Sequence, residues 1–194
     1  MKRIRVFLPV LILSGCAPTP DQSIETEGTA CLLEQHKLPG HELSADNNFD
    51  AEDNLANLSA EVPAEVMAAE IPGYRSHVAI GSGKQPQFLY LTLSTPYEAI
   101  QFDDAEGQPI PEHDNLFRIP GESQYHWDLA EKERGNLVLW GACSDNFQGS
   151  FDCMAHLPYK QIAINFEVHQ ANLHLYKEIE DFIQSQMAVC HPEL

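Results

Sequence analysis

The 194-residue sequence predicts an α+β fold, a largely antiparallel β-sheet or sandwich with a C-terminal helix packed on it. The first observation is a series of short segments between residues 76 and 168 that are rich in branched and aromatic side chains. Turn residues separate these segments, a pattern typical of hairpin-connected strands. The second is an apolar stripe at three- and four-residue spacing near the C terminus, which predicts an amphipathic helix. We expect six to eight strands in a single globular domain over residues 31–194.

The first part of this domain is expected to contain little regular structure. Residues 31–33 predict a short strand, and residues 44–61, which are acidic and rich in asparagine, predict a loop. Residues 63–70 predict a short helix, because proline suits the first turn of a helix and acidic side chains suit its start. Residues 72–73, Pro-Gly, would end that helix.

The middle of the chain is expected to form most of the sheet. Residues 76–80 and 87–94 flank a Gly- and Pro-containing stretch and predict a hairpin. Residues 137–140 are apolar throughout, which predicts a central strand buried on both faces. Further strands are predicted at residues 99–103, 116–119, 124–129, 151–157 and 161–168, and turns at residues 104–111, 120–121 and 131–135.

The C-terminal stripe predicts one helix that begins near Asn172, which could cap it. Apolar residues recur along one side of this helix, and acidic or amide residues occupy the other side. The apolar side should therefore pack on the sheet. The stripe consists of Leu173, Tyr176, Ile179, Phe182, Ile183 and Met187.

The N-terminal residues predict export from the cytoplasm. A basic start is followed by an apolar run over residues 6–13 and then by Leu13-Ser14-Gly15-Cys16, the order of a secretion signal and its cleavage site. At every position, these four residues resemble the lipobox of bacterial lipoproteins. The resemblance implies cleavage before Cys16, diacylglycerol on its sulfur and acylation of the new amino terminus. An apolar run of about eight residues is too short for a membrane span, which needs about 20.

The resemblance also implies where the protein resides. Residues 1–15 would be the lipoprotein signal peptide, and residues 16–30 a lipidated, flexible tether rich in Pro, Gln, Ser, Glu and Thr. Ala17 follows the cysteine, whereas in enterobacterial lipoproteins an aspartate at this position implies retention in the inner membrane. The expected location is the cell outer membrane, with the protein anchored by lipid and facing the periplasm.

The charge of the chain restricts its partners. The formal net charge is −18, and residues 1–15 carry three basic and no acidic residues, so cleavage leaves −21. Such a charge repels nucleic acid and anionic lipid headgroups, and it attracts a basic partner or cations. We therefore expect a basic protein partner and no nucleic acid. Solubility, or a salty habitat, is the alternative explanation of the charge.

Four cysteines besides Cys16 predict two disulfides in an exported protein, and four cysteines allow three pairings. Cys143 and Cys153 flank a polar, Gly-containing turn and can meet locally, which leaves Cys31 to pair with Cys190. A four-cysteine zinc site is the alternative. It would need closely spaced pairs of cysteines, and this sequence has none.

Nine histidines suggest metal binding, but none are spaced two or four residues apart, as ligands on a strand or a helix would be. Scattered surface histidines are therefore expected, with no metal and no cofactor. A calcium-loop pattern at Asp46, Asn48 and Asp50 has Ala51 in place of glycine and Asn57 in place of the bidentate glutamate. The histidines are His36, His41, His77, His113, His126, His156, His169, His174 and His191.

No arrangement of residues in the sequence predicts an enzyme. Ser82 lies in Gly-Ser-Gly-Lys, which lacks both the spacing of a phosphate-binding loop and that of a nucleophile elbow. The four cysteines of the predicted domain are expected to be oxidised, which argues against a thiol nucleophile. We therefore expect no catalytic residues.

The turn between Cys143 and Cys153 is the candidate binding site. It contains Phe147, with Asp145 and Asp152 nearby in the sequence. An aromatic side chain and two acids on a constrained loop are typical of a site that binds a basic protein. The alternative is that Phe147 folds back over the sheet.

These features together predict a protein-binding module. The size, signal and disulfide-braced layout are similar to those of periplasmic immunity lipoproteins, which neutralise toxins delivered by type VI secretion systems. The resemblance implies a high-affinity complex with a toxin. Three alternatives remain. They are a structural or accessory lipoprotein of a pilus, secretion or surface assembly, a metal-binding lipoprotein, and an envelope hydrolase whose site is assembled from distant residues.

Overall fold

A computed structural model describes residues 31–38, 59–111 and 113–190. Several of the predictions concern residues outside these ranges. They are the signal peptide, the lipid attachment at Cys16, the tether and most of the acidic loop, with its calcium-like pattern at Asp46, Asn48 and Asp50. His41 and His191 also lie outside the described residues.

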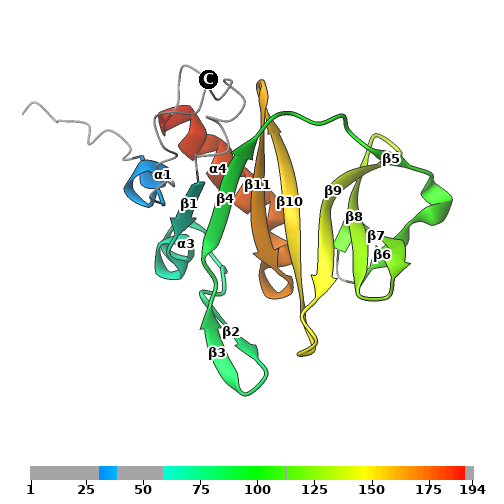
Figure 1. Ribbon diagram of the computed structural model, residues 1–194, viewed down its shortest axis with the longest axis horizontal. Coiled ribbons are helices and arrows are strands. Elements are labelled where there is room, and N and C mark those ends of the chain that lie inside the picture. Colours follow the sequence, from blue (N-terminus) through cyan, green and yellow to red (C-terminus); the bar gives the residue numbers. More distant parts are fainter. Residues whose placement is uncertain (1–30, 39–58, 112, 191–194) are drawn as a thin grey trace, which may run out of the picture.

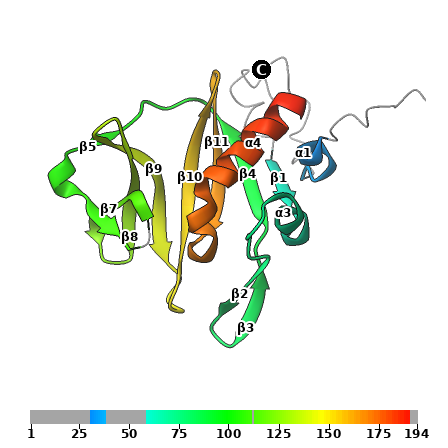
Figure 2. The same cartoon turned by 180° about the vertical axis from the view of Figure 1, so that it is seen from behind.

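The described chain forms a nine-stranded antiparallel sheet with helical segments on one face, which confirms the predicted α+β fold (Figures 1 and 2). The expected number of six to eight strands is too low. The strands are β1 (Ser59–Val62), β2 (His77–Ile80), β3 (Gly83–Pro86), β4 (Leu89–Ser94), β5 (Gln101–Phe102), β6 (Gln108–Ile110), β7 (His113–Ser123), β8 (His126–Glu133), β9 (Asn136–Asp145), β10 (Phe151–Tyr159) and β11 (Ile162–His169). The helices are α1 (Leu32–Gln35), α3 (Ala64–Glu70), the 3-10 helices η1 (Asp104–Glu106) and η2 (Gln170–Leu175), and α4 (Tyr176–Cys190). The sheet order is β1-β4-β11-β10-β9-β8-β7-β6, with β5 paired to β9, while β2 and β3 form a separate hairpin.

The main core lies between α4 and the strands that it covers. Leu89, Leu91 and Leu93 of β4 are buried at alternate positions, as their spacing predicts. The predicted apolar stripe supplies the other side of this core, including Ile179 and Ile183, which are almost completely buried. Removing one such side chain from water contributes about 1.5–3 kcal/mol, so the stripe is a large part of what holds α4 on the sheet.

No described helix covers the opposite face of these central strands, which is turned toward the viewer in Figure 1. Polar side chains bond to one another across it. His156 Nδ1 lies 2.7 Å from Asn165 Oδ1, and Asn165 Nδ2 donates to Ser94 Oγ at 3.0 Å. A smaller apolar cluster of Ile119, Ala130 and Leu137 holds together the other end of the sheet, near β5.

The two predicted disulfides are present, Cys31–Cys190 and Cys143–Cys153. The first joins the start of α1 to the end of α4. The expected strand at residues 31–33 is wrong, because these residues begin α1, where Cys31 Sγ accepts a hydrogen bond from Glu34 N at 3.2 Å. Leu32 N donates to Gln186 Oε1 of α4 at 2.9 Å, so docking on α4 outweighs strand propensity in this segment.

The hairpin predicted for residues 76–94 is also wrong. Its expected connection forms β3, which pairs with β2, and β4 instead pairs with β1 and β11 in the main sheet. The physical reason is burial. Strand β3 is exposed throughout, so pairing β4 with the small hairpin would leave the Leu89, Leu91 and Leu93 face in water. Strand β1, in turn, begins inside the predicted loop and buries Ala60.

Three turn predictions require correction. Strand β7 runs through Pro120 and Gly121, with a register shift before Ser123, and the chain turns at residues 124–125. A Cβ at Gly121 would lie 2.4 Å from the His126 carbonyl oxygen, so glycine is there for close strand approach rather than for a turn. Residues 104–111 form η1 and β6. Residues 131–133 belong to β8, and only Arg134 and the glycine after it adopt turn geometry.

Two expectations about burial and capping are wrong as well. Val138 and Leu139 are only half-buried, so residues 137–140 are not a strand buried on both faces. His169, rather than Asn172, caps the C-terminal helical segment, and its ring accepts a hydrogen bond from Ala171 N. Asn172 is instead buried, and its side-chain amide bonds to the backbone of Arg75.

Candidate functional site

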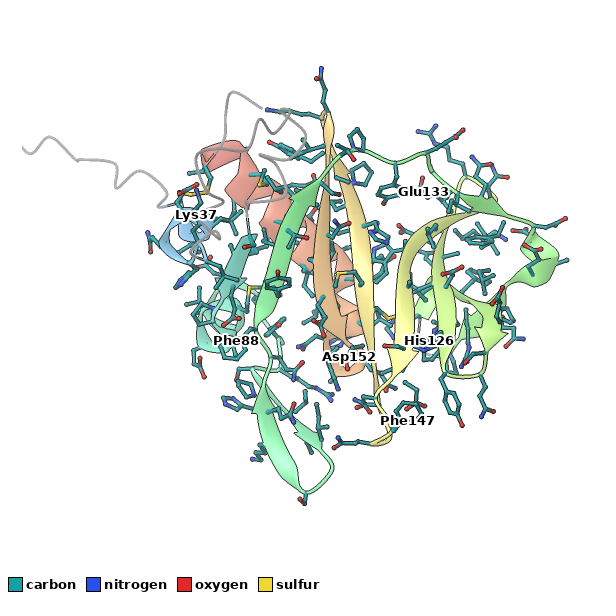
Figure 3. The ribbon with its side chains drawn as sticks, in the orientation of Figure 1. Lys37, Phe88, His126, Glu133, Phe147 and Asp152 are labelled. Atoms are coloured by element: carbon teal, nitrogen blue, oxygen red, sulfur yellow. A yellow bond between two sulfur atoms is a disulfide. The ribbon has the colours of Figure 1, made fainter. Side chains whose placement is uncertain are left out.

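Three hairpin ends meet at one end of the sheet. Tyr125, in the β7–β8 turn, accepts a hydrogen bond through its carbonyl oxygen from Asp145 N at 2.9 Å. The tip loop, defined as residues 146–150 between β9 and β10, brings the Phe147 ring to 4.9 Å from the Tyr125 ring, centroid to centroid. Gln148 of the same loop packs close to Gly81 in the β2–β3 turn. Figure 3 shows Phe147 at the end of the β9–β10 hairpin.

The tip loop is held by hydrogen bonds of its own. Asp145 Oδ1 accepts from Phe147 N at 2.6 Å. Asn146 Oδ1 accepts from both Gln148 N, at 3.0 Å, and Ser150 N, at 3.2 Å. The Cys143–Cys153 disulfide closes the two strands beneath the loop. Local side-chain acceptors of this kind satisfy the backbone of a turn, so the loop presents its side chains on an ordered backbone.

Phe147 has an unusual conformation for a bulky residue. Its φ is +59°, and its side chain is 74% exposed. The left-handed region costs a residue with a Cβ about 1–2 kcal/mol, and it favours glycine or asparagine. The ring is not buried enough to recover much of that cost in the folded monomer. The alternative expectation, in which Phe147 folds back over the sheet, is wrong.

The two acids predicted beside Phe147 lie in different places. Asp145 is half-buried, and its carboxylate is turned into the loop to hold the Phe147 amide. Asp152 is half-buried on β10, where it is paired with Ser144 on one side and His169 on the other. Figure 3 shows it further along the strand than Phe147. The structure therefore brings Asp145 to the tip loop and leaves Asp152 on the sheet.

A cleft of about 1120 Å³ adjoins the tip loop, with walls from the β2–β3 hairpin, η2 and β6–β8. Trp127 and Phe151 form an aromatic wall, with ring centroids 5.1 Å apart. Six basic or titratable side chains line the cleft. They are Arg75, His77, His113, Arg118, His169 and His174. Sequence reasoning missed this cleft, because its residues come from six separated segments with no common spacing.

Ser150 and His169 in the cleft wall resemble a nucleophile and its base, but their hydrogen bonds exclude that role. His169 Nδ1 accepts from Ala171 N at 3.0 Å, so the neutral ring carries its proton on Nε2 and donates it to Ser150 Oγ at 3.1 Å. The ring therefore has no free lone pair with which to take the Ser150 proton. Burial lowers the pKa of His169, and the charge of Asp152 opposes that shift.

A second cavity, of about 360 Å³, contains two buried glutamates bridged by a lysine. Lys177 Nζ lies 2.7 Å from Glu131 Oε2 and 3.0 Å from Glu180 Oε2. Tyr176 Oη donates to Glu131 Oε1 at 2.9 Å, and Trp140 Nε1 donates to Glu180 Oε1 at 2.6 Å. Each of the four carboxylate oxygens has a partner, so this cluster clamps α4 to β8 and β9.

The cluster shifts the pKa values of its members. Burial raises the pKa of Glu180, and its bonds to Lys177 and Trp140 oppose the shift. Burial acts to lower the pKa of Lys177. The hydrogen bonds and charges of Glu131 and Glu180 outweigh it and hold that pKa above its usual range. Lys177 therefore stays charged at neutral pH and bridges the two carboxylates as an ammonium.

Within the described ranges, no three His, Cys, Asp or Glu side chains are grouped as metal ligands would be. The helices of the same residues include none that is long and apolar enough to cross a bilayer. Comparison of the chain with protein-family models, curated proteins and solved structures found no match.

Proposed function

We propose that this chain is a lipid-anchored protein of the bacterial outer membrane that binds a basic protein through its hairpin tip and has no catalytic activity of its own. The observation that carries this proposal is the exposed Phe147 ring, held on an ordered loop in a backbone conformation that is unfavourable for it. Unfavourable local conformations of this kind concentrate at binding and catalytic sites. The ring and its Tyr125 neighbour form an aromatic pair that a partner could bury.

Physical arguments support a protein as the partner. Aromatic anchors dominate the binding energy of protein interfaces, and an ordered loop loses little entropy when it binds. The net charge of the chain would accelerate association with a basic partner. The lipobox resemblance supports the envelope location, and the similarity in layout to immunity lipoproteins supports a toxin as the partner.

The position of the tip suits an anchored binder. Helix η2, with six residues, continues directly into α4, with fifteen, and the two together are about 30 Å long. The tip loop lies near the η2 end, whereas Cys190, and with it Cys31, lies at the other end (Figure 1). A tether that enters the domain at Cys31 would leave the hairpin tip directed away from the point of attachment.

The test uses the full chain as bait to capture binding proteins from the native cell envelope, and compares it with a variant that lacks the Phe147 ring. We expect the wild-type chain to capture one stoichiometric basic protein. Phe147→Gly should weaken that complex about 30-fold or more, the loss of a hot-spot side chain worth about 2 kcal/mol. Phe88→Gly is the matched control, because Phe88 is also an exposed phenylalanine and lies away from the tip loop (Figure 3).

Equal capture by wild type and Phe147→Gly would contradict the proposed binding surface. A captured protein with lytic activity would support the immunity role. Capture of several components of one machine would instead support an accessory role. No captured protein at all, with zinc or copper retained by the purified chain, would contradict the binding-protein proposal and favour metal binding.

A further inference from the structure

The cleft beside the tip loop, here called the cationic cleft, has a composition opposite to that of the whole chain. The net charge of the chain is −18, yet no aspartate or glutamate is among the described lining residues. Beyond residues 1–15 the sequence has three arginines, and two of them, Arg75 and Arg118, line the cleft. The third, Arg134, lies outside it. Positive charge is thus concentrated at one place on an acidic protein.

Among the described residues, the arginines of the cleft have no ion-pair partner. Lys37, Lys132 and Lys177 each lie within 4.0 Å of a carboxylate oxygen. In the described chain, neither Arg75 nor Arg118 makes such a contact. An arginine that neutralised the acidic surface would pair with one of its many carboxylates. Both arginines instead line the cleft, and no described carboxylate serves as their counter-ion.

Contacts within the protein position both arginines, through the side chain of Arg118 and through the backbone of Arg75. The Arg118 guanidinium carbon lies 4.0 Å from the centre of the Trp127 ring, and Nη2 donates to the Gln124 carbonyl oxygen at 3.2 Å. These contacts use one N–H and leave the remaining donors of a planar fork. Arg75 is fixed through its backbone, because Arg75 N donates to Asn172 Oδ1 at 2.8 Å and its carbonyl oxygen accepts from Asn172 Nδ2 at 3.1 Å.

Not every basic group in the cleft is available to a ligand. His169 is occupied by Ser150 and Ala171, and His77 Nε2 lies 4.0 Å from Glu65 Oε1. The two arginines carry a charge at any pH near neutral, so they are the groups that would bind an anion. The aromatic wall supplies the apolar contact. The cleft volume of about 1120 Å³ is slightly above the usual range for small-molecule sites, roughly 300–1,000 Å³.

We infer that the cationic cleft binds an organic oxyanion, with carboxylate or phosphate groups on Arg75 and Arg118 and an apolar part against Phe151. Arginine forks bind both kinds of oxyanion through paired, charge-assisted hydrogen bonds. The ligand would lie in a site separate from the Phe147 ring, so this inference does not depend on a protein partner at the hairpin tip.

The inference can be tested by titrating the full chain with pyrophosphate and, separately, with citrate while tryptophan fluorescence is followed. Ionic strength is held constant with sodium chloride. Trp127 lines the cleft, so a bound anion should change its emission. We expect saturable binding of at least one of the two anions, with a Kd below about 1 mM. Pyrophosphate alone would indicate a phosphate ligand, and citrate alone a carboxylate ligand.

Variants assign the site. Arg118→Gln and Arg75→Gln should each weaken binding about tenfold, as expected for loss of a charge-assisted hydrogen bond. Arg134→Gln removes the same charge from the third arginine and should change the Kd less than about twofold. Arg75 is exposed, so its variant keeps the test valid if Arg118→Gln disturbs the Trp127 packing. No saturable change with either anion, or equal weakening by Arg134→Gln, would overturn the inference.

Discussion

The replacement Lys177→Met tests whether the buried carboxylate cluster clamps α4 to the sheet. Methionine keeps most of the side-chain length but removes the ammonium from Glu131 and Glu180, each of which is only 8% exposed. Both carboxylates keep one hydrogen bond, from Tyr176 and from Trp140, respectively. The variant therefore leaves two buried, partly bonded negative charges close together.

The expected loss follows from the burial of the partners. Removing one partner of a fully buried pair costs about 3–5 kcal/mol, because the other charge stays buried. The Lys177 side chain is 49% exposed, so water already screens part of the interaction, and we expect a loss of about 2–3 kcal/mol. Urea unfolding at neutral pH, followed by circular dichroism, measures this difference.

The same variant should respond to pH in a defined direction. Burial already raises the pKa of Glu180, and Lys177 opposes that shift, so without Lys177 the pKa of Glu180 in the folded state should rise further above its unfolded value. A carboxylate whose pKa is higher in the folded state than in the unfolded state stabilises the folded protein at a pH below its unfolded-state pKa. This stabilisation is lost as the pH rises through the folded-state pKa. The difference in the free energy of unfolding between variant and wild type should therefore be smaller near pH 4.5 than near pH 7.

Lys132→Met is the control, because Lys132 Nζ also lies 3.0 Å from a carboxylate, that of Asp104. Both side chains of that pair are well exposed, so its loss should cost less than about 1 kcal/mol. The clamp argument is refuted if Lys177→Met costs no more than Lys132→Met, or if its cost is the same at both pH values.

Three further perturbations test other parts of the fold. Replacing the Cys143–Cys153 pair by serine should lower the free energy of unfolding by about 3 kcal/mol, and replacing Cys31–Cys190 by about 5 kcal/mol, because the second disulfide closes a longer loop. If urea unfolding gave the opposite order, the loop-entropy argument would be contradicted. Wild-type stability should fall as the pH drops below about 6.5, because burial lowers the pKa of His169 in the folded state. His169→Gln should lose that part of the pH dependence. If the curves of stability against pH were parallel for the two proteins, another group would be responsible. Gly141→Ala should lower the stability measured by thermal unfolding by about 1–3 kcal/mol, because its Cβ would clash with the Met154 carbonyl oxygen. An unchanged Tm would mean that β9 and β10 can move apart without loss of stability.

Elements with a strong periodic pattern could be predicted from the sequence. The C-terminal stripe and the leucines of β4 have one apolar face each, and burial of that face determines the structure. The cysteine pairings followed from spacing, because one pair flanks a turn and only one other pair remains. The exposure of Phe147 was one of two alternatives, and the choice depended on backbone geometry that a sequence does not show.

Pairing partners and assembled sites could not be predicted from local patterns. Residues 83–86 contain turn-forming amino acids, yet they pair as β3 because β4 gains more burial in the main sheet. Glu131 lies in a charged stretch typical of a turn, and its burial depends on Lys177, 46 residues later. The same holds for the cationic cleft, because η2, β2 and β6–β8 are far apart in the sequence and lie together only in the folded chain.

The Cys31–Cys190 disulfide has a mechanical consequence for a domain attached by its N-terminal side. A pulling force that arrives at Cys31 divides between α1 and the covalent bond to the end of α4. Helix α4 lies across the strands with its apolar side buried, so this load is applied in shear along the main core and cannot peel off one edge strand at a time. The domain should therefore resist a force applied at Cys31 far better when this disulfide is oxidised than when it is reduced.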